Sequence, residues 1–189
     1  MKPIEFWCDT ETTGLKCDKN FIIQIAYICR DRNRDEGAQI LFKNNLNLRK
    51  DLFAPIEVEE GALKVNGYTM DDIISFKKES EVIKTVMKDI DSIPSSAIFC
   101  GFNTPFDIGF ISQMFKRQNY DFSKYFTLQH DVYKIVRRMV LTGKMYFTDM
   151  KQSTIAKKLG VECINPHDAL SDIETCIKIN DKIEEMLCK

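Results

Sequence analysis

An apolar run passes directly into two acids near the start of the chain, in Ile4-Glu5-Phe6-Trp7-Cys8-Asp9-Thr10-Glu11-Thr12-Thr13-Gly14-Leu15. Residues 4–8 are mostly large and apolar, which predicts a short buried strand. Side chains two apart on a strand point to one face, so the carboxylates of Asp9 and Glu11 should lie roughly 6.6 Å apart along it. Such a pair repels unless a cation lies between the two, and oxygen ligands suit Mg²⁺ or Mn²⁺. For an isolated Asp-x-Glu, a solvated loop start is the commoner alternative.

Predicted strands and helices alternate through the rest of the sequence. The β-branched run Phe21–Ile28 predicts a buried strand, Gln39–Lys43 its hairpin partner, and Ala97–Phe102 another buried strand, with a further strand near Phe126–Leu128. Apolar spacing and end signals predict helices over residues 57–65, 71–76 and 79–90, from Thr104, from about Asp131, up to Gly160, and from Asp168 onward. This order predicts an α/β fold with helices packed on a sheet.

Length and composition exclude several classes of protein. The 189 residues predict a single domain, 1–189, with a formal net charge of -1, which argues against coating nucleic acid through bulk positive charge. Seven cysteines without a Cys-x-x-Cys pair argue against a disulfide framework or a structural zinc site. No apolar run approaches the ~20 residues of a membrane span, and the N-terminus lacks a signal-peptide pattern. We therefore expect a cytoplasmic protein that has no membrane partner.

Other acids lie where predicted strands pass into helices. Asp107 falls in the first turn of a helix opened by Thr104-Pro105, where a capping box with Thr104 is the simpler interpretation. Asp172 lies one turn into the last helix, and Asp168 suits the N-cap position of that helix. His167 precedes the helix in a loop, where surface decoration is the ordinary alternative to catalysis.

Two further patterns have structural interpretations. Asp149-x-x-Gln152 predicts a capping box. His130, the second histidine, is expected to be structural or exposed. The sequence lacks a Gly-rich phosphate loop, a Gly-x-Ser-x-Gly elbow and a His-Glu-x-x-His helix. Nucleophilic catalysis by serine or cysteine therefore has no positive support.

Three ordered motifs resemble those of the DEDDh (DnaQ-like) 3′–5′ exonucleases. They are Asp9-Thr10-Glu11-Thr12-Thr13-Gly14-Leu15, Phe102-Asn103-Thr104-Pro105-Phe106-Asp107-Ile108-Gly109-Phe110, and His167-Asp168-Ala169-Leu170-Ser171-Asp172. The last has the His-x4-Asp spacing of the subclass. The Phe-Asp-Ile-Gly-Phe string is most similar to the proofreading exonuclease subunits of bacterial replicative polymerases. The resemblance implies a ribonuclease-H-like fold with a mixed five-stranded sheet and helices on both faces.

The resemblance also implies the composition of the catalytic site. Asp9, Glu11, Asp107 and Asp172 would hold two divalent ions, Mg²⁺ or Mn²⁺, and His167 would act as the general base. A terminal nucleotide would contact Thr12, Leu15, Asn103 and Phe106, although core packing is an equal alternative for Leu15 and Phe106. Many relatives have His-Asn where this chain has Phe102-Asn103. A role of that histidine in the relatives is therefore not assigned to Phe102.

The implied function is release of nucleoside 5′-monophosphates from single-stranded 3′ ends of DNA or RNA. Proofreading with a DNA polymerase subunit as partner is one setting for this reaction, and RNA trimming or degradation of short oligoribonucleotides is the alternative. A non-catalytic nucleic-acid-binding or polymerase-docking module is less consistent with the intact acids. Lys134, Arg137 and Arg138 share one helix face that could follow a phosphate backbone, with a solvated helix face as the simpler interpretation.

Overall fold

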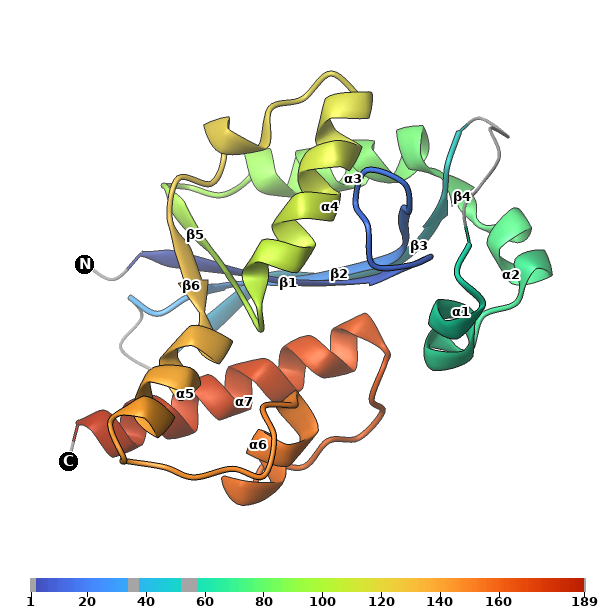
Figure 1. Ribbon diagram of the computed structural model, residues 1–189. Helices are drawn as coiled ribbons and strands as arrows, with labels where there is room; N and C mark the ends of the chain where they lie inside the picture. Colours follow the sequence, from blue (N-terminus) through green and yellow to red (C-terminus); the bar gives the residue numbers. More distant parts are fainter. Residues whose placement is uncertain (1–2, 34–37, 52–57, 189) are drawn as a thin grey trace.

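The computed structural model describes residues 3–33, 38–51 and 58–188. Within them, six strands form one mixed sheet in the order β4-β3-β2-β1-β5-β6 (Figure 1). β1 pairs antiparallel with β2 and parallel with β5, and the β2–β3 pair is antiparallel. The strands are β1 (Ile4–Thr12), β2 (Ile22–Asp31), β3 (Gln39–Arg49), β4 (Lys77–Lys78), β5 (Ala97–Gly101) and β6 (Gln129–Asp131).

Helices cover both faces of this sheet, as Figure 1 shows. Helices α3 and α4 lie on one face, and α5, α6 and α7 lie on the other. The short α1 and α2 lie beside the β2–β3 end. Their bounds are α1 (Glu60–Asn66), α2 (Met70–Ser75), α3 (Glu79–Asp91), α4 (Thr104–Arg117), α5 (Val132–Leu141), α6 (Gln152–Lys158) and α7 (Ala169–Leu187), with a 3-10 turn η1 (Phe122–Lys124) after α4. None of the helices in the described ranges is long and apolar enough to cross a membrane.

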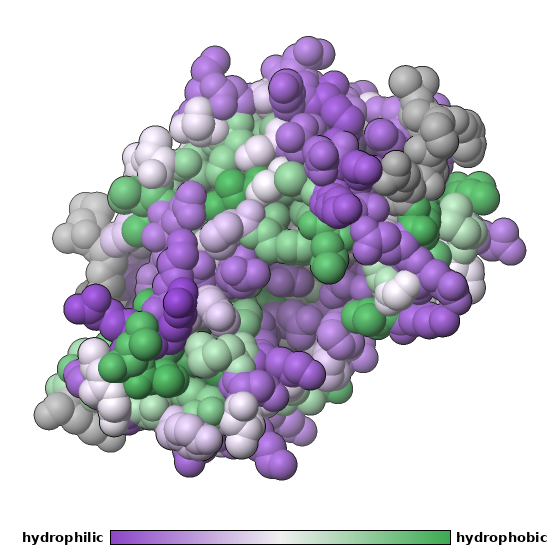
Figure 2. All heavy atoms as spheres, viewed as in Figure 1, coloured by the Kyte–Doolittle hydropathy of each residue, from purple (hydrophilic) through white to green (hydrophobic). Residues whose placement is uncertain are grey.

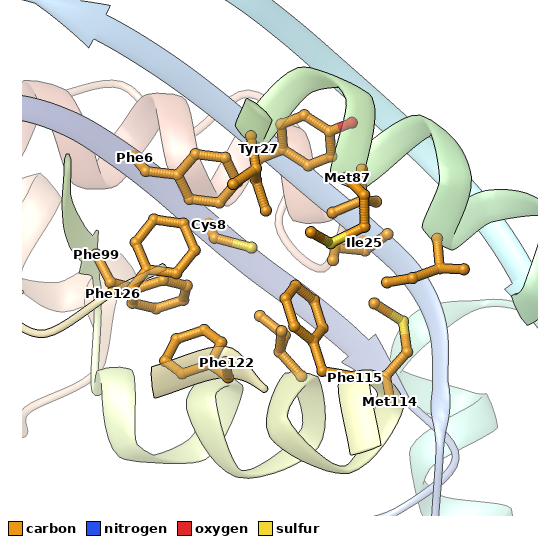
Figure 3. Packing of buried hydrophobic residues seen from close by; sticks show 14 of the residues in the cluster. Phe6, Cys8, Ile25, Tyr27, Met87, Phe99, Met114, Phe115, Phe122 and Phe126 are labelled. Atoms are coloured by element: carbon orange, nitrogen blue, oxygen red, sulfur yellow. The ribbon is translucent and has the colours of Figure 1, made fainter. Parts of the chain in front are cut away.

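The alternation of side chains along β1 divides the core into two layers. Phe6 and Cys8 point into an aromatic layer beneath α3 and α4, where the ring of Phe6 lies against Tyr27, Phe99 and Phe126 (Figure 3). Trp7 points the other way, into the aliphatic layer under α5, α6 and α7. Both faces of β1 are therefore buried, and burial continues through the polar residues Thr10, Glu11 and Thr12 at its carboxyl end.

The α/β fold class is confirmed, and several details differ from the expectations. The sheet has a sixth strand, because the two residues of β4 pair with β3, and the strand expected near Phe126–Leu128 lies at Gln129–Asp131. The first predicted helix begins at Glu60, while Glu57 lies outside the described residues. All seven cysteines are free.

The two capping boxes expected from sequence are wrong. Asn103 is the N-cap of α4, without a side-chain cap bond, and the Thr104 hydroxyl is buried without a hydrogen-bond partner among the described residues. The Asp149 carboxylate accepts a hydrogen bond from the backbone N–H of Lys151, the residue that caps α6. Asp107 instead accepts a hydrogen bond from Thr10, and Gln152 donates to the carbonyl of Asp172, so each of these side chains has a distant partner in place of a helix cap.

Candidate metal and nucleotide site

The carboxyl end of β1 presents its two acids toward α7. Asp9 and Glu11 have the same strand parity as Trp7, so they share its face of the sheet. The side chain of Glu11 is buried and that of Asp9 is half-buried. The expectation that both carboxylates lie on one face of a strand therefore holds in the structure.

Asp107 enters the site from the first turn of α4. Its side chain is 2 % exposed, and its Oδ1 accepts a hydrogen bond of 2.8 Å from the hydroxyl of Thr10. Gly101 makes this approach possible, since a Cβ there would lie 2.9 Å from the carbonyl oxygen of Cys8. The left-handed Asn103 then starts the helix, and its N–H donates to the carboxylate of Asp131 at 3.0 Å. Asp107 is thus a buried carboxylate whose hydrogen-bond partner is a β1 side chain.

The start of α7 supplies the remaining two groups. Asp168 caps the helix by accepting a hydrogen bond from the N–H of Ser171 at 3.0 Å, as expected. The backbone of His167 has a positive φ of 68°, and its N–H donates to Asp172 Oδ2 at 3.2 Å. Ligand atoms of Glu11, His167 and Asp172 all lie within 4.8 Å of one another. The tertiary structure therefore brings together groups separated by more than 150 residues of sequence.

Burial raises the pKa of each of the four carboxyls at this end of the sheet, the acidic cluster of Asp9, Glu11, Asp107 and Asp172, and repulsion between them adds to the rise at Asp9 and Glu11. Burial is the largest cause for Glu11, whose pKa rises to about 8 with contributions from Asp172 and Asp107. Burial also raises the pKa of Asp107, to about 7, although the Thr10 hydroxyl opposes the rise. The pKa of Asp9 is raised strongly by burial and by the Asp107 and Asp172 charges, and that of Asp172 is raised chiefly by burial. This is the electrostatic environment that a bound cation would relieve.

The donor set fits a divalent metal ion. Glu11 and Asp172 offer carboxylate oxygens, the hard ligands that divalent cations prefer, and the imidazole of His167 lies within reach of both. Asp9 and Asp107 are not part of this group of three, although their charges act on Glu11 or on each other. Burial is the main reason that the pKa values of Glu11 and Asp107 are raised, and the charges of Asp172 and Asp107 add to the rise at Glu11. The residues therefore fit the metal dependence expected from the sequence.

A pocket of about 370 Å³ opens beside Glu11. Leu15, which is 75 % exposed, and Phe106 both line it, so the core-packing alternative is wrong for Leu15. Phe106 also packs on Phe110, with ring centroids 4.9 Å apart. Figure 2 shows the surface hollowed between the α4 half and the α7 half of the molecule. The lining residues are Thr10, Glu11, Thr12, Gly14, Leu15, Glu59, Gly61, Ala62, Val65, Asn66 and Phe106.

Two of the expected nucleotide contacts have specific backbone roles. The carbonyl of Thr12 accepts a hydrogen bond of 2.9 Å from the Asn66 amide, and its hydroxyl donates to the carbonyl of Gly14. The first bond connects α1 to the end of β1, and the second lies within the turn that follows the strand. Asn103 does not line the pocket, and its place is the left-handed turn that starts α4. A role for Asn103 in binding a nucleotide therefore stays a prediction.

Three polar residues that support the site were not predicted from sequence. Gln24 on β2 is 3 % exposed; its amide donates to Asp168 Oδ2 at 3.2 Å and accepts from the N–H of Ala169 at 3.0 Å. Gln152 donates to the backbone carbonyl of Asp172 at 2.7 Å, and Thr10 bonds to Asp107. A glutamine within the apolar run 21–28 was a usable signal, because a buried amide requires partners.

His130 has the structural role expected for it. Its Nε2 lies 2.7 Å from Asn180 Oδ1, and its ring packs edge-on against Trp7. Lys134, Arg137 and Arg138 are exposed on α5, and Lys134 lies 3.6 Å from Asp131. Nothing in these contacts connects the basic α5 face to the acidic cluster.

The family comparison agrees with the site geometry. The model of the RNase_T exonuclease family matches residues 6–180. The chain belongs to this exonuclease family. Its motifs have the DEDDh pattern of 3′–5′ exonucleases, which confirms the resemblance seen in the sequence. A curated relative, the 3′-5′ exonuclease DinG of Staphylococcus aureus (strain MRSA252), is 27% identical over 172 residues, which are 90% of this chain and 17% of the relative.

Solved structures with the same fold are those of E. coli exonuclease I. The form in complex with a dT13 oligonucleotide superposes with a TM-score of 0.79 at 18% identity, and the zinc-bound form in complex with single-stranded DNA with a TM-score of 0.82 at 17% identity. Each match covers 97% of this chain and 41% of exonuclease I. The family fold is thus shared, while the chain spans less than half the length of exonuclease I.

Proposed function

We propose that this chain is a metal-dependent 3′–5′ exonuclease that releases nucleoside 5′-monophosphates from single-stranded 3′ ends. The observation that carries the proposal is the convergence of Glu11, His167 and Asp172 within 4.8 Å, beside a pocket lined by Leu15 and Phe106. Acids and an imidazole next to an open apolar pocket suit hydrolysis of a charged ester that bears a base. Family membership supports the same reaction.

Asp9, Glu11, Asp107 and Asp172 are the proposed metal ligands, with Mg²⁺ or Mn²⁺ as the physiological ions and two as the proposed number. When bound, the ions supply charge stabilisation at the phosphate and a deprotonated water for attack. The Thr10 hydroxyl keeps Asp107 oriented toward the site, and the His167 N–H does the same for Asp172. These bonds restrict the carboxylates before any ligand arrives, which lowers the entropic cost of binding.

His167 is the proposed general base. Its side chain is exposed at the mouth of the cluster, where it can take the proton of an attacking water and pass it to solvent. Leu15 and Phe106 would pack against the terminal base without reading its hydrogen-bonding edge, which suits a sequence-independent nuclease. Thr12 would contribute its backbone, and Asn103 is proposed to contact the same nucleotide.

Single-stranded DNA is the favoured substrate because the matched exonuclease I structures hold DNA oligonucleotides. RNA remains the alternative, in trimming or in degradation of short oligoribonucleotides, because recognition of the 2′-OH depends on contacts of the bound strand. Proofreading beside a DNA polymerase subunit is a proposed setting for the DNA reaction. A non-catalytic binding module is the competing function from another class.

The test is digestion of 5′-labelled DNA and RNA single strands of one sequence with Mg²⁺, and again with EDTA. We expect stepwise shortening from the 3′ end with Mg²⁺, arrest with EDTA, and loss of activity in Asp107→Asn. A mismatched duplex end tested alongside reports on proofreading. Folded protein that binds the strands without shortening them in either buffer would show a binding module instead.

A further inference from the structure

A second groove lies beside α6, and none of its lining residues belongs to the acidic cluster. It has a volume of about 490 Å³ and lies between the segment that joins α5 to α6 and the helix α6 itself. Tyr146 lines this groove and is 76 % exposed, so its ring is accessible to a ligand. The lining residues are Tyr146, Phe147, Thr148, Thr154, Lys157 and Lys158.

The charge around this groove is strongly one-sided, in contrast to the nearly neutral chain. Residues 142–158 include four lysines, at positions 144, 151, 157 and 158, and one acid, Asp149. All four lysines are exposed, and none of them forms an ion pair with another described residue. The Asp149 carboxylate is already engaged by the Lys151 backbone N–H and the Thr154 side chain. The groove thus combines unpaired positive charge with an exposed aromatic ring, the pair of features that single-stranded nucleic acid recognises.

Helix α6 connects this groove to the acidic cluster. Gln152, at its first turn, donates to the carbonyl of Asp172, while Lys157 and Lys158 are at its last turn. Seven residues of helix extend about 10 Å, a distance that a few nucleotides of an extended strand can span. Helix α6 also packs beside α7 on the same side of the sheet (Figure 1).

We infer that this groove is a second binding site for single-stranded nucleic acid, which holds the strand a few nucleotides 5′ of the terminal one. The inference rests on the proposed exonuclease function and extends it. Tyr146 stacks on a base, and Lys157 and Lys158 contact the phosphates on either side. Neither contact depends on base identity. The carboxylates of the acidic cluster repel the phosphates of an approaching strand. A nearly neutral chain therefore needs a separate basic site to bind long strands more tightly.

The test compares binding of a long oligothymidylate, about 15 nucleotides, with a short one of about four nucleotides. Fluorescence anisotropy in EDTA measures the Kd of each without cleavage. For the wild type we expect tighter binding of the long strand. Tyr146→Ala and the double variant Lys157→Gln/Lys158→Gln should each weaken binding of the long strand by about 10-fold and leave the short strand unchanged. The double variant should also lower the salt dependence of log Kd by about 1.4, since each phosphate contact contributes about 0.7.

Lys84→Gln/Lys88→Gln is the matched control, because it removes two exposed lysines from α3 on the other face of the sheet. It should change neither Kd. The inference is overturned if the wild type binds both lengths equally, if the α3 control weakens the long strand as much as the α6 variant does, or if folded groove variants bind the long strand normally. If length-dependent binding holds but Mg²⁺ produces no shortening, the groove stands and the proposed exonuclease function fails.

Discussion

His167 adopts a left-handed backbone conformation at the mouth of the acidic cluster, which aims its N–H at Asp172. We predict that His167→Ala lowers kcat by about 100-fold or more, because the attacking water loses its proton acceptor. Steady-state kinetics on a single-stranded oligonucleotide measure the effect. His130→Gln is the matched control, since His130 bonds to Asn180 and faces Trp7 away from the cluster. Equal kcat values for wild type and His167→Ala would remove His167 from the role of base.

Leu15 exposes most of its side chain at the wall of the pocket beside Glu11. Leu15→Ala should change the free energy of unfolding by less than about 0.5 kcal/mol, because little buried contact is lost. It should raise KM for an oligonucleotide several-fold through loss of packing on the terminal base. Thermal unfolding and initial rates measure the two effects. Leu141→Ala, a leucine of equal exposure on α5, should alter neither. A large fall in stability without a change in KM would return Leu15 to a structural role.

At the scale of elements, the start of α7 is held against β2 by Gln24. Its amide bonds to both Asp168 and Ala169, at the start of the helix that carries Asp172, and the amide of Asn45 donates to the same oxygen of Asp168. Gln152 supports the same turn from α6. The acids on β1 are held by the backbone pairing of β1 with β2, in which Asp9 lies opposite Ala26 and Glu11 opposite Gln24.

This arrangement predicts different effects for two substitutions of Gln24. Gln24→Met leaves the buried Ala169 N–H unpaired, which should cost about 1–3 kcal/mol of stability and weaken Mn²⁺ binding several-fold. Gln24→Glu keeps an acceptor for that N–H but places a second carboxylate beside Asp168, so its metal affinity should depend on pH more steeply than that of the wild type. Calorimetric titration with Mn²⁺ provides the measurement. Wild-type metal affinity in both variants would show that Gln24 does not position the site.

For the whole molecule, the concentrated acids predict an unusual pH dependence in metal-free buffer. The pKa of Glu11 is raised to about 8 and that of Asp107 to about 7, so the folded state holds protons that the unfolded chain releases above about pH 4.5. Their stabilising contribution is complete below that pH and is lost as the pH rises through 7 to 8. We predict a Tm in EDTA that is lower at pH 8.5 than at pH 5.5 by about 5 °C or more.

Two comparisons test this origin of the pH dependence. Saturating Mg²⁺ should narrow the difference in Tm, because a bound cation favours the charged carboxylates. Glu11→Gln should narrow it without metal, since it removes one of the titrating groups. Asp51 and Glu184 do not contribute between pH 5.5 and pH 8.5. Their pKa values are lowered in the folded chain, so they affect stability only at lower pH. A metal-free Tm that rises from pH 5.5 to pH 8.5 would contradict the predicted charge repulsion.

Much of the fold and of the acidic set was predictable from local sequence. The apolar run ending at Asp9, the β-branched run of β2 and the start of α4 all correspond to elements of the structure. These signals are local: periodicity, end residues and the spacing of His167 and Asp172 need only a few neighbouring positions. The resemblance of three motifs then joined acids that no single pattern could connect.

Capping patterns failed where the acid or amide had a distant partner. Local pairing predicted that Asp107 would bond with Thr104, whereas the folded chain pairs it with Thr10 across 97 positions. Gln152 likewise bonds to Asp172 instead of to its own helix end. These choices depend on which groups meet in the interior, a fact that no window of sequence contains.

The sequence by itself determined the family and the α/β class, because short ordered motifs and local periodicity encode both, and it supplied the acids that are proposed as metal ligands. Only the tertiary structure decided that Leu15 faces a pocket, that Gln24 holds α7, and that Tyr146 and the lysines of α6 form a groove apart from the acids. Exposure and long-range bonding are properties of the packed chain, since they depend on where whole elements lie against one another.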